Sequence, residues 1–240
     1  MKYQGNKQRY IKYILPIMLA ERKSLTQYFI EPFCGSCSVI EHVKGYRIAS
    51  DKNRYLIAMW KVLCGGLHKY PDVPRRIERN FYNDVRDSYN KKDGRYPDYI
   101  IGWVGFMGSF NGRFFDGGYS GHDVKGRDYI GENIKNTLSQ VPFLSGVEFY
   151  ARNYDELLLP QQSIIYCDPP YKNTKQYATS KNFDYEKFYQ WCREKKQEGH
   201  TLFVSEYEMP DDFKCVWQMD VKTAQNPHKT KLATEKLFTL

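Results

Sequence analysis

Two short apolar segments, each followed by a helical segment, constrain the fold of this chain most. Residues 27–31 (QYFIE) and 46–51 (YRIASD) are β-prone, and a turn with Pro and Gly ends the first. The segment CSVIEHV (37–43) then resembles a helix, and so does NRYLIAMWKVL (53–63) after the second strand. Because a strand-helix-strand order builds a parallel sheet with right-handed crossovers, this pattern predicts an α/β fold.

A second pair of strands is predicted late in the chain. Residues 163–167 (SIIYC) are apolar and run directly into DPPY, and residues 201–207 (TLFVSEY) form another β-prone segment. A helical pattern over 184–199 separates them. The α/β pattern therefore resumes after an interruption.

The region between the two α/β parts differs from them in amino-acid composition. It holds 12 of the 17 glycines, all within 65–131, and aromatic residues are interleaved with them. One interpretation is a loop-rich insertion with a small core of its own. The other is a subdomain facing nucleic acid, with arginines for phosphates or base edges and aromatic rings for stacking. In SFNGRFF (109–115), Asn111 and Arg113 are the candidate DNA contacts, although Asn-Gly is also a strong hairpin signal.

Charge and apolar patterning limit the classes of protein. The formal net charge is +8 and the pI near 9.0, which suits a polyanionic partner without requiring one. No apolar run has the length needed to cross a bilayer, and the N-terminal segment lacks a signal-peptide pattern. We therefore expect a soluble cytoplasmic protein with no membrane partner. Its six scattered cysteines are more typical of reduced thiols than of disulfides.

The turn EPFCGS (31–36) is a candidate cofactor site. In open parallel sheets, ligands bind beyond the carboxyl ends of the strands, and Gly35 lets the backbone approach a ligand closely. Asp51 follows Glu31 by about 20 positions, at the end of the next strand, where a carboxylate can accept both hydroxyls of a ribose. Because G-x-G-x-x-G is absent, the turn favours a cofactor without a pyrophosphate, such as S-adenosylmethionine.

The segment DPPY (168–171) is the more specific motif. The exocyclic amine of adenine is a weak nucleophile, and acceptors on both of its N–H groups would let its nitrogen become pyramidal. Asp168 supplies one acceptor, and the Pro169 carbonyl supplies the second, since consecutive prolines fix the backbone. The Tyr171 ring offers a stacking surface for a flipped base. The chemistry is positioning and electrostatic stabilisation, without a covalent intermediate.

Taken together, these motifs resemble the Dam-like adenine-N6 DNA methyltransferases of bacteria and their phages. The segments YQGNK, EPFCGSCSV, SDKN, DPPY, FDYEKFYQW, LFVSEYEMP and ATEKLF occur in the order of that family. The resemblance implies a Rossmann-like, S-adenosylmethionine-dependent core with an inserted, mostly helical and loop DNA-recognition subdomain. It implies a catalytic role for Asp168, Pro169, Pro170 and Tyr171, and cofactor binding by Tyr3, Lys7, Glu31, Pro32, Phe33, Cys34, Gly35, Ser36, Asp51 and Asp168.

The remaining expectations concern the limits of these parts. We expect the core to comprise 1–60 and 147–240 and the recognition region to comprise 61–146. The cofactor adenine is assigned to Tyr154 or Asp155. The expected partner is double-stranded DNA, bound by a monomer that self-associates at most transiently, in a bacterial or phage-infected cell.

Other functions compete with this interpretation. Cys34 and Cys37 form a C-x-x-C that a thioredoxin-like dithiol would need, but DPPY and Asp51 would then have no role. No second ligand pair accompanies them, so a zinc site is not expected. A cytosine-N4 methyltransferase and a catalytically silent DNA-binding relative stay open as alternatives. Cys37 also departs from the family, which usually has glycine at this position.

Overall fold

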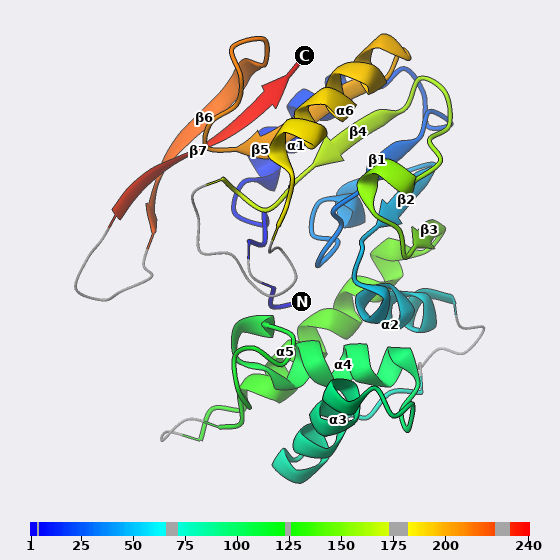
Figure 1. The fold of residues 1–240 in the computed structure, drawn as a ribbon, viewed down its shortest axis with the longest axis vertical. Coiled ribbons are helices and arrows are strands. Elements are labelled where there is room, and N and C mark those ends of the chain that lie inside the picture. The colour runs from blue at the N-terminus through cyan, green and yellow to red at the C-terminus, as the bar shows by residue number, and fades with distance from the viewer. Residues whose placement is uncertain (4, 66–71, 123–125, 173–181, 224–230) are drawn as a thin grey trace.

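The computed structural model describes residues 1–3, 5–65, 72–122, 126–172, 182–223 and 231–240. Its centre is a seven-stranded sheet in the order β3-β2-β1-β4-β5-β7-β6 (Figure 1). The strands are β1 (Phe29–Glu31), β2 (Arg47–Ser50), β3 (Val147–Tyr150), β4 (Ile164–Cys167), β5 (Thr201–Glu206), β6 (Lys214–Thr223) and β7 (Lys231–Thr239).

The first five strands are parallel, and β7 is antiparallel to both of its neighbours. Strands β1, β2 and β4 are buried along their whole length, as expected for strands covered on both faces. From β1 the chain adds β2 and β3 on one side and β4 and β5 on the other, so the strand order switches between β1 and β4. Open α/β sheets bind ligands at such a switch point. This topology confirms the predicted Rossmann-like α/β fold.

Three helices belong to the strand-helix pattern: α1 (Ile11–Ala20), α2 (Arg54–Gly65) and α6 (Tyr185–Gln197). The Asn53 side chain accepts the N–H groups of residues 55 and 56 and so caps α2. Asp184 caps α6 in the same way by accepting the Lys187 N–H at 2.9 Å. Both helices bury an apolar stripe at helical spacing, as their sequences predict.

Three further helices lie between α2 and β3, and they gather at one end of the molecule (Figure 1). They are α3 (Arg79–Lys91), α4 (Asp98–Gly108) and α5 (Tyr129–Gln140). Helix α4 is buried on nearly all sides, and Gly102 allows it to approach the Tyr55 carbonyl of α2, where a Cβ atom would lie only 2.1 Å away. Most aromatic side chains here therefore form a core, which favours the structural interpretation of their interleaving.

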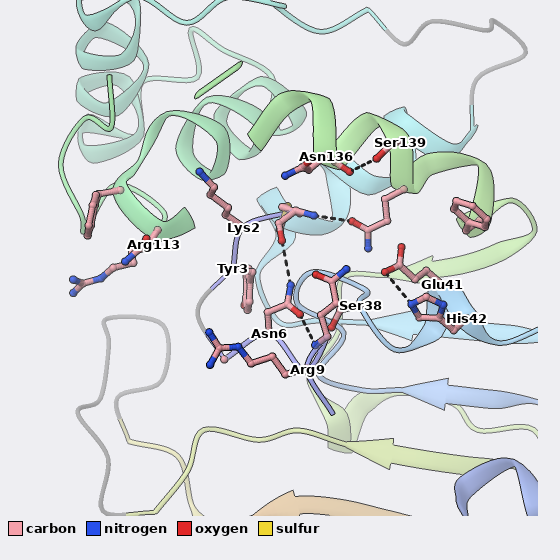
Figure 2. A pocket seen from close by; sticks show the side chains of 17 residues that line it. Lys2, Tyr3, Asn6, Arg9, Ser38, Glu41, His42, Arg113, Asn136 and Ser139 are labelled. Atoms are coloured by element: carbon pink, nitrogen blue, oxygen red, sulfur yellow. Dashed lines mark hydrogen bonds and ion pairs between the residues drawn. The ribbon is translucent and has the colours of Figure 1, made fainter. Parts of the chain in front are cut away.

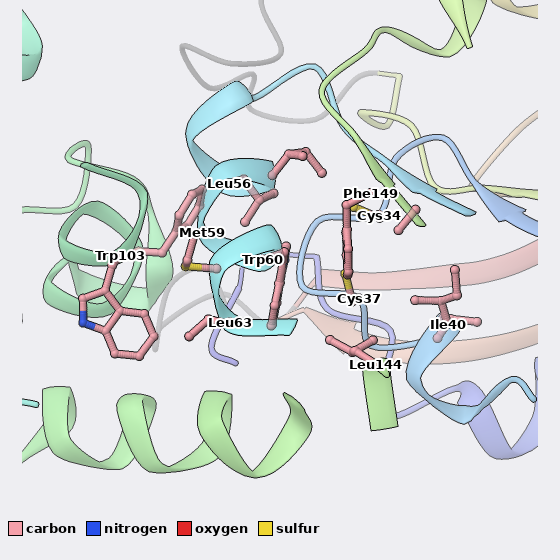
Figure 3. Close-up of a cluster of buried hydrophobic side chains, with 14 of the residues drawn as sticks. Cys34, Cys37, Ile40, Leu56, Met59, Trp60, Leu63, Trp103, Leu144 and Phe149 are labelled. Carbon is pink, nitrogen blue, oxygen red and sulfur yellow. The ribbon is translucent and has the colours of Figure 1, made fainter. Parts of the chain in front are cut away.

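The larger core cluster joins these helices to the sheet (Figure 3). Trp60 on α2 stacks on Phe149 of β3, with 6.5 Å between ring centroids, and lies beside the turn that holds Cys34 and Cys37. A second cluster under α6 covers the other face of β4 and β5. Burial on this scale fixes the turn after β1 against α2.

One predicted helix is absent from the described residues. Residues 37–43 form turns and the short 3₁₀ helix η1 (Ile40–His42) rather than an α-helix. Cys37 at the start of this segment has a φ of 56°, in the left-handed region, and Val43 at its end is extended, so only one helical turn lies between them. The other 3₁₀ helices are η2 (Phe110–Gly112), η3 (Val141–Leu144) and η4 (Tyr154–Glu156). Within the described ranges, no helix is long and apolar enough to span a membrane.

Candidate functional site

The carboxyl ends of the parallel strands meet at one edge of the sheet. Glu31 ends β1, Asp51 follows β2, Asp168 follows β4 and Glu206 ends β5. Because neighbouring parallel strands end at the same edge, four carboxylates gather there. Acidic groups in such a cluster repel each other unless cations, hydrogen bonds or a ligand compensate them.

The turn after β1 is tied to β2 and α2 by backbone hydrogen bonds. The Cys34 N–H donates to the Ser50 carbonyl at 2.9 Å, and the Trp60 indole N–H donates to the Gly35 carbonyl at 3.1 Å. Gly35 has φ +44°, and its N–H donates to Asp51 Oδ2 at 3.3 Å. The turn thus lies against the acidic residue at the end of the next strand, as the sequence predicted for a cofactor site.

Asp51 is held by two backbone donors. In addition to the Gly35 N–H, the Asn53 N–H donates to Oδ1 at 2.9 Å. Burial raises the pKa of Asp51, while these two hydrogen bonds lower it. Each carboxylate oxygen has a second lone pair, so Asp51 retains the capacity to accept two ligand hydroxyls.

The two cysteines of the turn are buried. Cys34 is 5% exposed and Cys37 is fully buried, and burial raises the pKa of both thiols. A reactive dithiol needs the opposite shift, since the thiolate is the nucleophile. The structure therefore argues against the thioredoxin-like alternative. Cys37 accepts the left-handed backbone that glycine usually supplies, and its side chain fills core space instead.

The N-terminal segment covers this turn. A Cβ atom on Gly35 would lie 2.7 Å from the Tyr3 ring, so the ring packs directly over the glycine. On the far side Tyr3 packs against Phe106 of α4, with 5.8 Å between centroids. Tyr3 therefore connects the turn to the helices between α2 and β3.

Lys7 lies between two carboxylates. Its Nζ is 2.9 Å from Asp168 Oδ1 and 3.2 Å from Glu235 Oε1, and both Lys7 and Glu235 are almost entirely buried. Burial opposes the charged form of Lys7, but Asp168 and Glu235 outweigh it and raise the lysine pKa. Burial raises the pKa of Asp168 to about 6, while Lys7 lowers it and Glu235 raises it. The site thus holds a partly exposed carboxylate with one neighbouring ammonium.

Glu31 carries a buried oxygen that lacks a partner among the described residues. Glu31 is 3% exposed, and its Oε1 accepts no hydrogen bond there. Burial raises the pKa of Glu31 well above its usual range, and the Asp168 charge adds to that shift. An unsatisfied buried carboxylate oxygen is costly, and a ligand ammonium at this position would compensate it. This donor and acceptor pattern fits an amino-acid-bearing cofactor such as S-adenosylmethionine.

The residues assigned to the cofactor adenine are engaged in contacts within the protein. Tyr154 is 4% exposed, and its ring stacks on Phe33 at 5.4 Å between centroids and contacts Trp191 edge to face. The Asp155 carboxylate forms an ion pair with Lys187 of α6. Of this group Phe33 is half-buried and belongs to the turn itself.

The DPPY segment leaves β4 along the acidic edge. Pro169 is buried, and Pro170 and Tyr171 are half-buried. The Tyr171 hydroxyl donates to Glu235 Oε1, and the Lys7 ammonium lies 4.5 Å from the Tyr171 ring centroid. Glu206 fixes the end of the segment, because its Oε2 accepts the Lys172 N–H at 2.9 Å. Burial raises the pKa of Glu206 to about 7.

A groove of about 1280 Å³ opens beside the N-terminal segment (Figure 2). Asn111 and Arg113, the predicted DNA contacts, both line it, together with Tyr3. Asn111 has φ +53°, the left-handed backbone typical of a turn, so the alternative interpretation of Asn111-Gly112 as a turn signal is also met. The groove walls carry many amide and basic side chains: Lys2, Asn6, Gln8, Arg9, Asn136 and Gln140.

Two functional candidates escaped the sequence interpretation. Glu235 and Glu206 lie in segments that resemble the family, but neither was assigned a role. The available signal was a carboxylate inside or at the end of a predicted strand or family segment, as in ATEKLF (233–238) and TLFVSE (201–206). Among the described residues, no group of three or more His, Cys, Asp and Glu side chains is arranged to hold a metal ion.

No curated protein matches the sequence. Among solved structures, precorrin-6y C5,15-methyltransferase from Geobacter metallireducens GS-15 shares 8% identity with a TM-score of 0.36, over 94% of this chain and 85% of that one. SMU.472, described as a candidate methyltransferase complexed with SAH, shares 11% identity with a TM-score of 0.41, over 98% of this chain and 52% of that one.

A sequence family covers most of the chain. The family described as D12 class N6 adenine-specific DNA methyltransferase matches residues 3–219, which include both strand pairs, the turn after β1 and DPPY. The match supports adenine-N6 methylation over the alternative of cytosine-N4 methylation. This chain therefore belongs to the D12 class N6 adenine-specific DNA methyltransferase family.

Proposed function

We propose that the chain moves the methyl group of S-adenosylmethionine to the N6 amine of an adenine that is flipped out of double-stranded DNA. The observation that carries the proposal is the convergence of Lys7, Asp168 and the Gly35–Asp51 pair at one edge of the sheet. Family membership supports the adenine-N6 chemistry. The flipped base and the duplex substrate are our inference.

The turn after β1 would hold the cofactor, which when bound supplies an electrophilic methyl group on a sulfonium. Asp51 would accept the ribose hydroxyls, and Glu31 would accept the ammonium of the methionine end. The buried, unpartnered oxygen of Glu31 supports the second assignment. Tyr3, Phe33 and the backbone of residues 32–36 would form the walls. Tyr154 and Asp155 would act beside the adenine end, chiefly by holding Phe33 and α6 in place.

Asp168 would activate the target amine. Lys7 and the Tyr171 hydroxyl both hydrogen-bond to Asp168, and a remaining lone pair of the carboxylate would accept an N–H of the amine. The Pro169 carbonyl would accept the other N–H, and Pro170 restricts the backbone that presents it. As the N–C bond forms and the C–S bond breaks, the amine loses a proton. A carboxylate with a pKa of about 6 is suited to accept that proton near neutral pH.

The groove lined by Asn111 and Arg113 would bind the DNA. Arginine and lysine side chains compensate phosphate charge, while amide side chains match the donor and acceptor pattern of base edges. Tyr3 lines the groove and also packs on Gly35, so DNA in the groove would lie next to the cofactor turn. This arrangement supports 1–60 and 147–240 as the catalytic core and 61–146 as the inserted recognition region.

A transfer assay tests the proposal. The chain is incubated with methyl-labelled S-adenosylmethionine and a DNA duplex of mixed sequence, and the DNA is then digested to nucleosides. We expect the label in N6-methyldeoxyadenosine. Label in a cytosine derivative, or DNA binding without any transfer, would contradict the proposal.

A further inference from the structure

Glu235 is a buried carboxylate on a strand that is otherwise peripheral to the proposed chemistry. Strand β7 pairs with β5 up to the Glu206–Lys236 register, so Glu235 lies just beyond the end of β5, at the edge where the other carboxylates gather. Glu235 is 5% exposed. A charge at this depth is retained only when partners compensate its loss of hydration, so its partners define its role.

The partners of Glu235 within the described part of the chain are Lys7 and Tyr171, and both belong to the proposed catalytic site. Its Oε1 lies 3.2 Å from the Lys7 ammonium, which also contacts Asp168 at 2.9 Å. The same Oε1 accepts the hydroxyl of Tyr171. The Tyr171 ring is further enclosed by Tyr207, which meets it edge to face with 4.7 Å between centroids. One carboxylate thus holds both the cation beside Asp168 and the last residue of DPPY.

We infer that Glu235 is a positioning residue for methyl transfer, which shares Lys7 with Asp168 and fixes the Tyr171 ring. This inference rests on the proposed function. By drawing part of the ammonium charge to itself, Glu235 leaves Asp168 a stronger hydrogen-bond acceptor for the amine. By anchoring the Tyr171 hydroxyl, it sets the plane against which the target base would stack.

The charges of Lys7, Asp168 and Glu235 predict the direction in which the pKa of Asp168 should move when Glu235 is changed. Lys7, Asp168 and Glu235 together carry one net negative charge when ionised. If Glu235 were neutral, Lys7 would serve Asp168 alone, and the pKa of Asp168 would fall because the Glu235 charge raises it. Other titratable groups interact electrostatically with Asp168. They are Glu31, Glu206, Tyr166, Tyr171, Tyr3 and Cys167, and of these only the Tyr171 hydroxyl is changed in the variants below.

The variant Glu235→Gln separates positioning from simple support of the fold. Glutamine keeps the length of the side chain and an oxygen that can accept the Tyr171 hydroxyl, but it lacks the charge that shares Lys7. Tyr171→Phe makes the complementary change, since it removes the hydroxyl and keeps both carboxylates. Asp220→Asn on β6 is the matched control, because it removes one exposed carboxylate from the same hairpin.

The experiment measures single-turnover methyl transfer to a DNA duplex between pH 5 and 9 for the wild type and the three variants. For Glu235→Gln we expect a rate about tenfold lower at pH 8, and an acid limb whose midpoint lies about one pH unit lower than in the wild type. Tyr171→Phe should lower the rate and move the midpoint to higher pH, because the hydrogen bond from Tyr171 lowers the pKa of Asp168. Asp220→Asn should match the wild type in both respects.

A Glu235→Gln variant with the wild-type rate and midpoint would overturn the inference, as would a lower rate with an unmoved midpoint. Should circular dichroism show that this variant is unfolded, Glu235→Asp replaces it. Asp keeps the charge with a shorter reach, so a slower rate at an unchanged midpoint is expected, and an unchanged rate would overturn the inference. A folded wild type without transfer would instead refute the proposed function.

Discussion

The Lys7 ammonium lies 2.9 Å from Asp168 Oδ1, although most of the chain separates the two residues in sequence. The contact joins the N-terminal segment to the strand end that carries DPPY. It engages Oδ1 of the carboxylate, to which the Tyr171 hydroxyl also contributes a hydrogen bond. Because Lys7 is buried, this pair is screened by solvent far less than a surface ion pair.

Asp168 should control the acid limb of the reaction. Asp168 can accept the proton that the amine loses only when its carboxyl group is ionised, and burial raises its pKa to about 6. The transfer rate should therefore fall as the pH drops through about 6. Lys7→Met removes the cation that lowers this pKa, so the acid limb should move to higher pH, which is the direction opposite to that expected for Glu235→Gln. A Lys7→Met profile that moves to lower pH would contradict the electrostatic account.

Asp51 should act on cofactor affinity. Asp51→Ala removes the carboxylate proposed to accept two ribose hydroxyls, and hydrogen bonds to charged groups contribute about 1.5–3 kcal/mol each. We expect the Kd for S-adenosylmethionine to rise by about 100-fold or more, with a smaller effect on the rate at saturating cofactor. Isothermal titration and saturation kinetics measure the two quantities separately. An unchanged Kd would remove Asp51 from the site.

Gly35 should tolerate no side chain. Its φ of +44° disfavours any L-residue, and an added Cβ atom would meet the Tyr3 ring at 2.7 Å. Gly35→Ala should weaken cofactor binding because Tyr3 must move away from the turn. Gly146→Ala is the control for backbone strain alone, since its φ is +77° and no atom lies within 4 Å of the added Cβ. Equal cofactor affinities for the two variants would contradict the role of the Tyr3 contact.

Arg113 and Asn111 should affect DNA binding in different ways. Arg113→Ala removes a cation proposed to contact phosphate, so affinity should fall on every sequence and the slope of log K against log salt should decrease by about one. Asn111→Ala should instead change the preference among duplex sequences. Arg193→Ala, which removes an arginine of α6 that forms an ion pair with Asp212, serves as the control. If Arg193→Ala lowered the affinity for DNA as much as Arg113→Ala, the effect would come from the net charge of the protein and not from a contact at Arg113.

Glu41 should make stability depend on pH. Burial raises its pKa to about 7 from an ordinary value of 4.5, while the Met1 ammonium and Gln140 lower it. A carboxyl with a raised pKa contributes stability below about 4.5, and that contribution is lost as the pH rises through about 7. The free energy of unfolding should therefore fall more between pH 5 and pH 8 in the wild type than in Glu41→Gln. Urea titrations at both pH values measure the difference, and parallel declines would show that Glu41 does not titrate in this range.

Much of the core could be predicted from the sequence because its signals are local. The apolar runs that form β1, β2, β4 and β5, and the capped α2 and α6, are each visible within about a dozen residues. The Asp51 and Asp168 positions followed from strand ends in a parallel sheet. The predicted helix over 37–43 was wrong because the left-handed backbone of Cys37 is a tertiary feature, fixed by burial beside Trp60.

The contacts made across long stretches of sequence could not be predicted in the same way. Lys7 was assigned to the cofactor, but its position between Asp168 and Glu235 depends on how β7 docks against β5. The burial of α4 likewise depends on its packing against α2, which a glycine-rich sequence does not disclose. Pairing of this kind is set by the folded sheet and its packing rather than by local propensity.

The most direct measurement compares DNA from cells that express the wild-type chain with DNA from cells that express Asp168→Ala, in a host without adenine methylation of its own. Both chains should accumulate in folded form and bind DNA equally. The account predicts N6-methyldeoxyadenosine at a defined sequence with the wild type and a loss of about 100-fold or more with the variant. Equal methylation by the two chains, or none by a folded wild type, would contradict it.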